Sequence, residues 1–261
     1  MGRSIDAIAG VGLADRSRKS RWPARMDFWQ SATGLMLGLF MWAHMFFVAS
    51  ILISMDFMWA VTRMFEGYYV FGKGYPGIVS AIVAMVVMLF IAHALLAMRK
   101  FPANYRQYRL FIGHKNMLHH PDTTLWWVQV VTGFLLFFLA APHLFQMLMH
   151  PGAIGPYGSG DRVWSGSWWP LYLALLFLVE LHGGIGLYRL AVKWGWFVGR
   201  DANASRRRLS ALKWGLTLFF LALGILTLAA YIKIGYEHRA QVGEGYVPSW
   251  MQTSGQARDV R

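Results

Sequence analysis

Five long apolar segments alternate with polar connections along the chain. We predict membrane-spanning helices near residues 28–53, 77–98, 124–149, 169–192 and 212–234, with ends defined to within a few residues. Each segment reaches or exceeds the roughly 20 residues that a helix needs to cross the hydrocarbon core of a bilayer. The pattern therefore predicts an all-α membrane protein with five transmembrane helices.

Lysine and arginine are concentrated in alternate connections. They cluster at residues 16–25, 99–115 and 193–208, whereas the segments 54–76 and 150–168 carry nearly balanced charge. Because basic loops stay on the cytoplasmic side, the N-terminus and both basic loops are expected in the cytoplasm and the C-terminus outside. Residues 1–26 show no secretory signal pattern.

The chain divides into three predicted parts. Residues 1–26 form a cytoplasmic N-terminal segment, residues 27–235 the transmembrane domain, and residues 236–261 a weakly ordered tail on the outer side. We expect the aromatic outer segment 55–76 to contain a short helix along the interface. The segment 152–167, rich in glycine and serine, is expected to be a loop.

Composition supports a membrane protein and restricts its chemistry. The chain is 56% apolar and only 14% charged, so its net charge of +13 indicates cytoplasmic basic loops rather than binding to nucleic acid. It contains no cysteine, which excludes disulfides, thiolate-bound iron–sulfur clusters and cysteine-bound zinc within this chain. The nine histidines are then the main candidate metal ligands.

Four histidines lie within spans, one in each of the first four. Counting about 1.5 Å per residue places His44 and His143 in the outer half of the membrane and His93 and His182 in the inner half. A single membrane histidine is equally well explained by a hydrogen bond between helices. Two opposed pairs at two depths instead favour axial ligation of two stacked haems b inside a bundle of the first four helices. Zinc would require three or four ligands at one level.

The other histidines lie in polar segments. We expect them to be solvated loop residues: His114, His119, His120, His150 and His238.

A Thr-Gly pair precedes two of the membrane histidines. Gly34 and Gly133 stand ten residues before His44 and His143, about 15 Å along a helix and hence near the depth of the inner haem. A missing side chain there would make room for a cofactor. Close helix packing by Gly34 and Gly38 explains the first pair equally well.

The fourth span contains a carboxylate at membrane depth. Glu180 lies two residues before His182, so the two side chains point about 200° apart and have different neighbours. Such carboxylates usually serve a function, although a structural hydrogen bond to a neighbouring helix remains the alternative.

Several stretches resemble the dihaem cytochrome b subunit of the quinol:fumarate reductase and succinate:quinone reductase family. They are DFWQSATGLMLGLFMWAHMFFVASIL, FIAHALLAMRKFPANYRQY, DTTLWWVQVVTGF and WPLYLALLFLVELHGGIGLYRLAVKWGW, which together include all four histidines. The likeness is strongest to the single-subunit, five-helix, dihaem menaquinol:fumarate reductase type.

The resemblance implies roles for particular residues. His93 and His182 would hold the proximal haem, and His44 and His143 the distal one. Residues at the positions of the haem propionate contacts are Gln30, Ser31, Trp126, Arg162 and Lys193. Arg162 and Lys193 are equally well explained as interfacial anchors. Glu66 matches the carboxylate of the menaquinol site, and Glu180 a residue proposed to carry protons.

The resemblance also implies a function and partners. The chain would oxidise menaquinol and pass electrons through two haems b to an iron–sulfur and a flavoprotein subunit on the cytoplasmic face, for reduction of fumarate. The complex would be a dimer of heterotrimers in the bacterial cytoplasmic membrane, in contact with lipid and not nucleic acid. Two alternatives stay open: succinate:quinone reduction by the same complex, and the dihaem cytochrome b of a hydrogenase or formate dehydrogenase. A transporter that binds an ion through its membrane histidines and Glu180 is a third, non-enzymatic class.

Overall fold

The computed structural model describes residues 21–118 and 121–253. Five helices in this part of the chain are long and apolar enough to cross a membrane. They are α2 (Trp22–Ala49), α5 (Pro76–Met98), α7 (Pro121–Met149), α9 (Trp169–Lys193) and α10 (Ala202–Glu237). The predicted all-helical fold with five transmembrane helices is confirmed.

Two long helices extend beyond the apolar windows that predicted them. Helix α2 begins six residues before residue 28, with Pro23 in its first turn, where a proline is favourable. Helix α10 begins at Ala202, because the Asp201 side chain accepts hydrogen bonds from the backbone N–H groups of Asn203 and Ala204. A first-turn proline at α2 and a side-chain cap at α10, rather than hydrophobicity, mark these two ends.

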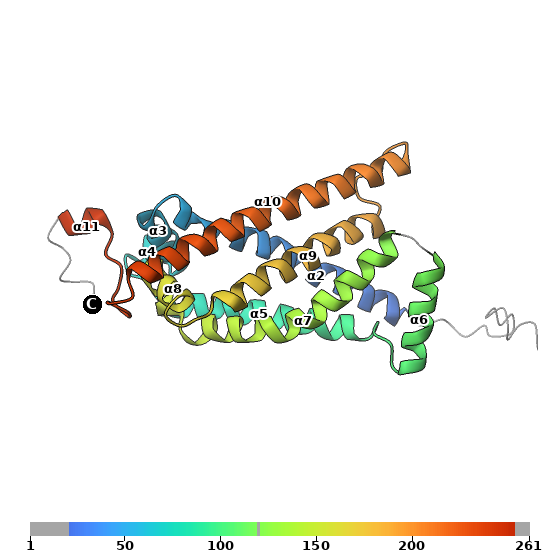
Figure 1. The fold of residues 1–261 in the computed structure, drawn as a ribbon, viewed down its shortest axis with the longest axis horizontal. Coiled ribbons are helices and arrows are strands. Elements are labelled where there is room, and N and C mark those ends of the chain that lie inside the picture. Colours follow the sequence, from blue (N-terminus) through green and yellow to red (C-terminus); the bar gives the residue numbers. More distant parts are fainter. Residues whose placement is uncertain (1–20, 119–120, 254–261) are drawn as a thin grey trace, which may run out of the picture.

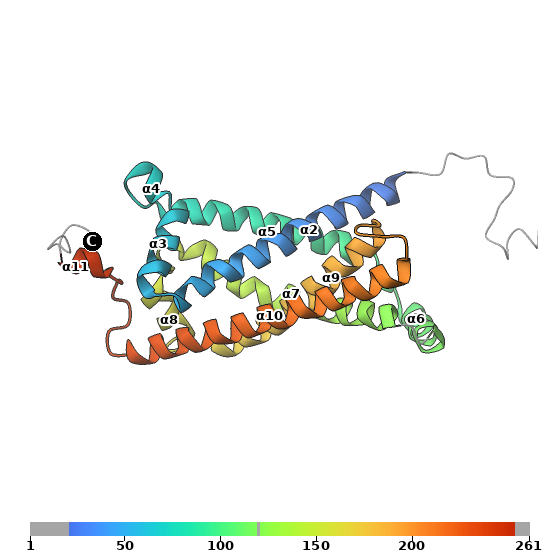
Figure 2. The same cartoon turned by 90° about the horizontal axis from the view of Figure 1, so that it is seen from above.

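The helices α2, α5, α7 and α9 form a bundle, and α10 packs outside it against α9 and α2 (Figures 1 and 2). The short helix α6 (Tyr105–Leu118) lies at one end of the bundle. The opposite end carries α3 (Met55–Phe65), α4 (Tyr68–Phe71), α8 (Pro156–Val163) and α11 (Ser249–Thr253). We name the α6 end the inner end and the opposite end the outer end, following the topology that the charges predict.

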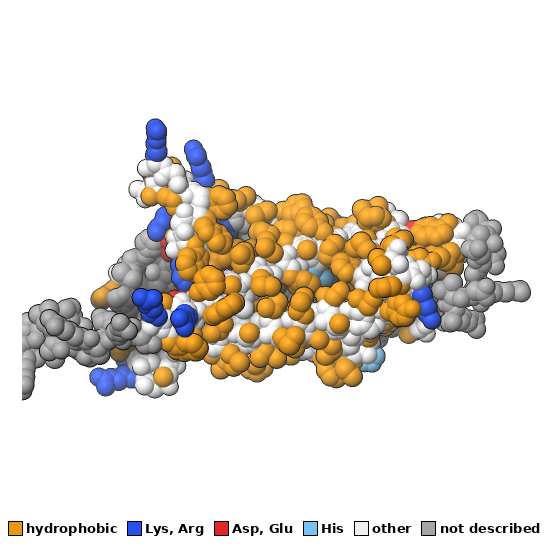
Figure 3. Space-filling model, turned by 180° about the vertical axis from the view of Figure 1, so that it is seen from behind, with side chains coloured by type: hydrophobic (Ala, Val, Ile, Leu, Met, Phe, Trp, Pro, Cys, Tyr) orange, Lys and Arg blue, Asp and Glu red, His pale blue; other side chains and the backbone are white. Residues whose placement is uncertain are grey.

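The surface agrees with a membrane location. Figure 3 shows apolar side chains over the length of the bundle, with lysine and arginine at its two ends. Many large apolar side chains of the spanning helices are exposed, including Met88, Leu95 and Leu218 at 64–65%. Lipid is the solvent that suits such a surface.

At the outer end, one of the two segments predicted from the sequence is as expected and the other is not. The segment 55–76 contains α3 and α4, in agreement with the predicted short helix. The segment 152–167 is not a loop, because it contains α8 with Pro156 in its first turn. Gly160 of α8 lies directly against the backbone of Gly235 in α10, a close approach that needs glycine on both helices and that only the folded chain reveals.

The C-terminal tail was predicted to be weakly ordered, and this prediction is wrong for residues 238–253. His238 is 5% exposed and pairs through Nδ1 with Asp161 Oδ1 at 2.8 Å. Its ring stacks on Tyr157 with ring centroids 4.0 Å apart. His238 is therefore not a solvated loop residue, whereas His150 is exposed as expected. The ring of His114 lies outside the described side chains, and His119 and His120 lie outside the described residues.

Candidate haem and quinol site

A cavity of about 1160 Å³ runs through the interior of the bundle. It is lined mainly by apolar side chains of α2, α5, α7 and α9, and it contains all four membrane histidines. Sites for one small molecule usually occupy about 300–1,000 Å³, so this space is large for a single ligand. Its volume and its four imidazoles mark it as the candidate site.

The outer pair of histidines comes from α2 and α7. The ring centroids of His44 and His143 lie 6.2 Å apart, and the His143 ring is also edge-on to Tyr172 at 5.4 Å. The Nδ1 of His143 has no hydrogen-bond partner among the described residues. Two facing imidazoles, one with an unsatisfied polar atom, leave nitrogen available for a ligand.

The inner pair comes from α5 and α9. The ring centroids of His93 and His182 lie 6.4 Å apart. The pairing therefore follows the depths expected from the sequence, since helices that run in the same direction contribute the partners of each pair.

The separation of the rings fits one metal ion between each pair. A metal–imidazole bond is about 2.0–2.1 Å, and a further ~1.2 Å from nitrogen to ring centre on each side gives centroids roughly 6.4 Å apart. Among residues 21–118 and 121–253, no group of three or more His, Cys, Asp or Glu side chains could hold a metal ion. Two imidazoles at each level suit a group that brings its own equatorial ligands, such as a haem.

Hydrogen bonds fix the tautomer of the inner histidines. His182 Nδ1 lies 2.9 Å from the carbonyl oxygen of Gln129, which can only accept, so Nδ1 carries the proton. The Thr33 hydroxyl donates to the Trp29 carbonyl at 2.8 Å and can accept from His93 Nδ1 at 3.2 Å. In both rings Nε2 keeps the lone pair that a metal requires. Sequence reasoning missed this role of Thr33, although it noted the Thr-Gly pairs.

Gly34 and Gly133 lie against the inner histidines. A Cβ atom on Gly34 would stand 2.9 Å from His93 Cε1, and one on Gly133 would stand 2.7 Å from His182 Cε1. Both glycines are at the inner depth, as expected, but the room they leave is filled by imidazole. They thus set the ring positions, and Gly38 separately contacts Leu187 of α9.

Polar groups line both ends of the cavity. Gln30, Ser31, Trp126 and Lys193 line its inner end. Lys193 Nζ lies 3.3 Å from Ser31 Oγ and 3.4 Å from Asp27 Oδ2, and Asp27 also pairs with Arg99 and with Lys100 at 3.0 Å. The Gln30 Oε1 atom is buried and has no hydrogen-bond partner among the described residues. These groups suit an anionic substituent of a bound cofactor.

Arg162 is the cation at the outer end. Its Nε donates to the Tyr172 hydroxyl at 3.0 Å and its Nη2 to Ser159 Oγ at 3.2 Å, and it lines the cavity. Helix α8, which sequence analysis missed, supplies both Arg162 and Ser159. The five predicted propionate residues thus all line the cavity, four at one end and one at the other.

Glu66 is buried at the end of α3, with 1% of its surface exposed, and is not a solvated loop residue. Its carboxylate pairs with Arg63 and lies beside Gly74, where any Cβ would collide with it. In this part of α3 the side chains that line the cavity are Thr62 and Phe65, while Glu66 faces Arg63. No local pattern singled out Arg63 as the partner of Glu66.

Glu180 faces away from the cavity. It is fully buried, and neither carboxylate oxygen has a hydrogen-bond partner among the described residues. Leu176 and Gly184, one turn before and after it, contact α10 at Gly224 and Thr217, so Glu180 lies on the same face between α9 and α10. His182 points into the cavity instead, as the 200° separation predicted.

A buried lysine lies further along this interface. Lys213 of α10 is 5% exposed, and its Nζ lies 3.9 Å from the ring centroid of Trp214 and 5.3 Å from that of Tyr188. It has no hydrogen-bond partner among the described residues. Sequence analysis did not identify it, because one lysine near the end of a span usually reaches the interface.

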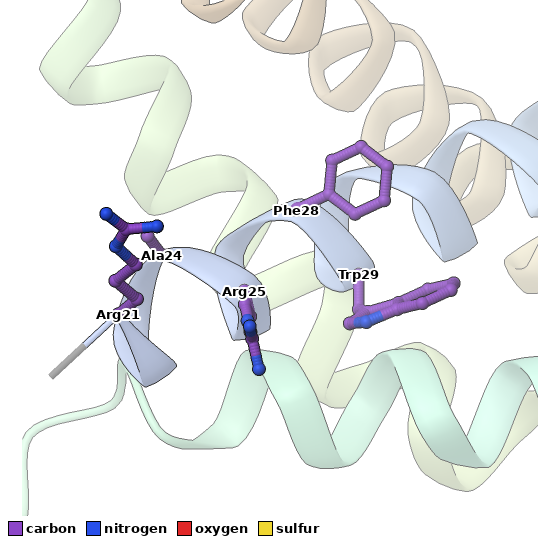
Figure 4. Close-up of a pocket in the computed structure, with 5 residues that line it drawn as sticks. All are labelled: Arg21, Ala24, Arg25, Phe28 and Trp29. Atoms are coloured by element: carbon purple, nitrogen blue, oxygen red, sulfur yellow. The ribbon is translucent and has the colours of Figure 1, made fainter.

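A second, shallow pocket lies at the start of α2. Figure 4 shows its lining of Arg21, Ala24, Arg25, Phe28 and Trp29, which belong to α2 and the residue that precedes it. It measures about 340 Å³ and contains none of the candidate site residues. We assign no role to it.

Comparison with known proteins identifies similar chains. The model of the succinate dehydrogenase/fumarate reductase transmembrane subunit family matches residues 105–231. The fumarate reductase cytochrome b subunit of Wolinella succinogenes is 54% identical over 226 residues, which cover 87% of this chain and 88% of that protein. A protein of the same name from Helicobacter pylori strain J99 is 52% identical over 228 residues, with the same coverage.

Proposed function

This chain belongs to the family of succinate dehydrogenase/fumarate reductase transmembrane subunits and is the membrane anchor of a fumarate reductase, and from this premise we propose how it works. It oxidises menaquinol at its outer end and holds two haems b, through which electrons reach iron–sulfur and flavoprotein subunits that reduce fumarate. The observation that carries this proposal is the two facing pairs of imidazoles at two levels of one cavity.

The four histidines are the proposed axial ligands. His44 and His143 hold the distal haem, and His93 and His182 hold the proximal one. When bound, the haems carry single electrons between the two ends of the bundle. The protein contributes the position and basicity of each imidazole, which Thr33 and the Gln129 carbonyl adjust for the inner pair.

The polar groups at the cavity ends bind the haem propionates in this proposal. Lys193, Gln30, Ser31 and Trp126 serve the proximal haem, because they line the inner end. Arg162 serves the distal haem from α8. Cations favour ionised carboxylates through charge-assisted hydrogen bonds. Asp27, one turn before Ser31 in α2, holds Lys193 in place.

Glu66 is the proposed proton acceptor of menaquinol oxidation. Loss of two electrons from a quinol releases two protons, and a carboxylate at a quinol hydroxyl can accept one of them as a general base. The buried position of Glu66 and its pairing with Arg63 support a carboxylate kept away from bulk water until a quinol replaces that contact.

Glu180 is the proposed carrier of protons across the membrane. Its burial without a hydrogen-bond partner among the described residues argues against the alternative of a structural hydrogen bond. Carboxylates at membrane depth commonly serve proton relays. Because Glu180 lies between α9 and α10, the proposed proton path runs outside the haem cavity.

The partners bind at the inner end in this proposal. The basic segment around α6 and the N-terminal residues face the cytoplasm, where the iron–sulfur and flavoprotein subunits dock. The complex lies in the bacterial cytoplasmic membrane and forms a dimer of heterotrimers.

A reduced-minus-oxidised spectrum of the purified complex, with haem quantified per chain, tests the proposal. We expect two b haems that titrate at two potentials, and each single variant H44A and H93A should lose one of them. A His44→Ala variant that kept both haems with unchanged spectra would refute the assignment. The potentials, compared with those of the quinone and fumarate couples, also distinguish fumarate reduction from succinate oxidation.

A further inference from the structure

The chain after α10 folds back over the outer end and is fixed there by two aspartates. Asp161 of α8 accepts from His238 Nδ1 at 2.8 Å and from the backbone N–H of Gly243 at 3.0 Å. Asp161 and His238 are 7% and 5% exposed. Both carboxylate oxygens of Asp161 are therefore used to hold residues that follow the last span.

The second aspartate is Asp56, in the first turn of α3. It accepts hydrogen bonds from the Tyr246 hydroxyl at 2.6 Å, the Ser249 backbone N–H at 3.0 Å and the Ser249 hydroxyl at 2.6 Å. Tyr246 also contacts the Tyr157 ring of α8, with centroids 5.1 Å apart. The tail thus connects α8, which carries Arg162, with α3, which precedes Glu66.

Four residues on one face of α3 connect the tail with Glu66. Asp56, Trp59, Arg63 and Glu66 follow the three- and four-residue spacing that places side chains on one helix face. Trp250 of the tail packs edge-on against Trp59 at 5.7 Å, and the Arg63 guanidinium lies 5.3 Å from the Trp59 ring centroid. Arg63 in turn pairs with Glu66.

We propose that the C-terminal tail is a positioning element of the quinol site. The tail holds Asp56 through hydrogen bonds, and it packs against Trp59. The Trp59 ring in turn positions the Arg63 guanidinium, and Arg63 positions the Glu66 carboxylate. The inference rests on the proposed oxidation of quinol at Glu66. A tail that only stabilised the fold would affect the haems and the quinol reaction together, whereas a positioning tail affects quinol oxidation alone.

The test uses the assembled complex and a soluble naphthoquinol. A Y246F/S249A variant removes two hydroxyl donors without altering α3, and E244Q changes an exposed tail residue as the matched control. We expect Y246F/S249A to lower kcat/KM for the naphthoquinol about fivefold. The haem content and the reduction of fumarate by a reduced viologen dye, which bypasses the quinol site, should stay unchanged. S249T alone, which keeps the hydroxyl, should retain the wild-type rate.

A double-mutant cycle with R63Q tests the route to Glu66. If the tail acts through Arg63, Y246F/S249A should cause little further loss in the R63Q background. A full additional loss would show that the tail acts elsewhere and would overturn the inference. A chain that ends after Glu244 provides a second variant, and wild-type naphthoquinol oxidation by it would equally overturn the inference.

The variant E66Q separates this inference from the proposed function. Wild-type naphthoquinol oxidation by E66Q would refute the proposed proton acceptor, and the inference with it. An impaired E66Q beside unimpaired tail variants would refute the inference alone.

Discussion

Gly133 of α7 lies directly against the imidazole of His182, so that a Cβ atom there would stand 2.7 Å from His182 Cε1. We predict that G133A displaces this ring and lowers the content of the inner haem, while the outer haem stays bound. Forcing a methyl group into such a contact costs about 1–3 kcal/mol. Haem quantification and reduced-minus-oxidised spectra measure the effect. The control is G215A, because a Cβ on Gly215 meets nothing within 4 Å, and equal haem loss in both variants would contradict the prediction.

Thr33 should tune the inner haem without being needed for its binding. T33V keeps the shape of the side chain but removes one of two acceptors of the His93 ring, the other being the Gln30 backbone, so the imidazole becomes less basic. We expect unchanged haem content and a higher midpoint potential of one haem, measured by redox titration. T227V is the matched control, because Thr227 lines the same cavity and, among the described residues, its hydroxyl bonds only the Leu223 carbonyl in its own helix. An unchanged potential in T33V would exclude this role.

The pair of Asp161 and His238 should stabilise the outer end. D161A leaves His238 Nδ1 and the Gly243 N–H without their acceptor in a buried position. Leaving a buried hydrogen-bond donor without its acceptor costs about 1–3 kcal/mol. We expect a lower thermal midpoint of the purified complex and faster proteolysis of the tail. E237Q, at a carboxylate with 62% of its side chain exposed, should have the wild-type midpoint.

Tyr246 in the docked tail should ionise only at a pH above the ordinary range of tyrosine. Burial, followed by the hydrogen bond to Asp56, raises the pKa of Tyr246 above its ordinary value of 10.0. The contribution of this group to docking is therefore complete below pH 10 and is lost as the pH rises through the raised pKa. In the absorbance difference spectrum between the wild type and Y246F, the phenolate band should appear only above pH 10. A phenolate already formed below pH 10 would mean that Tyr246 is not docked.

Glu180 should be required for turnover but not for haem binding. E180Q keeps the size of the side chain and removes the exchangeable proton of the carboxyl group. We predict intact haem spectra and a loss of quinol:fumarate turnover of about a hundredfold in proteoliposomes. E237Q serves again as the control. A wild-type rate in E180Q would favour the structural alternative for this residue.

Much of the bundle was predictable because the signal for each membrane helix lies within its own residues. Length and hydrophobicity define each span from its own residues, and a fixed rise per residue then orders His44, His93, His143 and His182 by depth. The facing pairs follow from that order alone. Gly34 and Gly133 were placed at the right depth for the same reason, although the group they accommodate is an imidazole.

The outer end was not predictable, because its contacts join residues far apart in the sequence. Asp161 and His238 are separated by 77 residues, and Asp56 and Ser249 by 193. A polar tail with no apolar periodicity resembles a disordered terminus until its partners are known. The burial of Glu66 and Lys213 likewise depends on neighbouring segments that no local pattern reveals.

The position of the tail imposes an order on biogenesis. Synthesis proceeds from the N-terminus, so every proposed axial ligand is made before residue 183, whereas Tyr246 and Ser249 emerge only after all five spans. A nascent chain can thus enclose its cofactor cavity while its outer end is still open. The site facing the quinol would be completed last, once the final span has crossed the membrane and carried the tail with it.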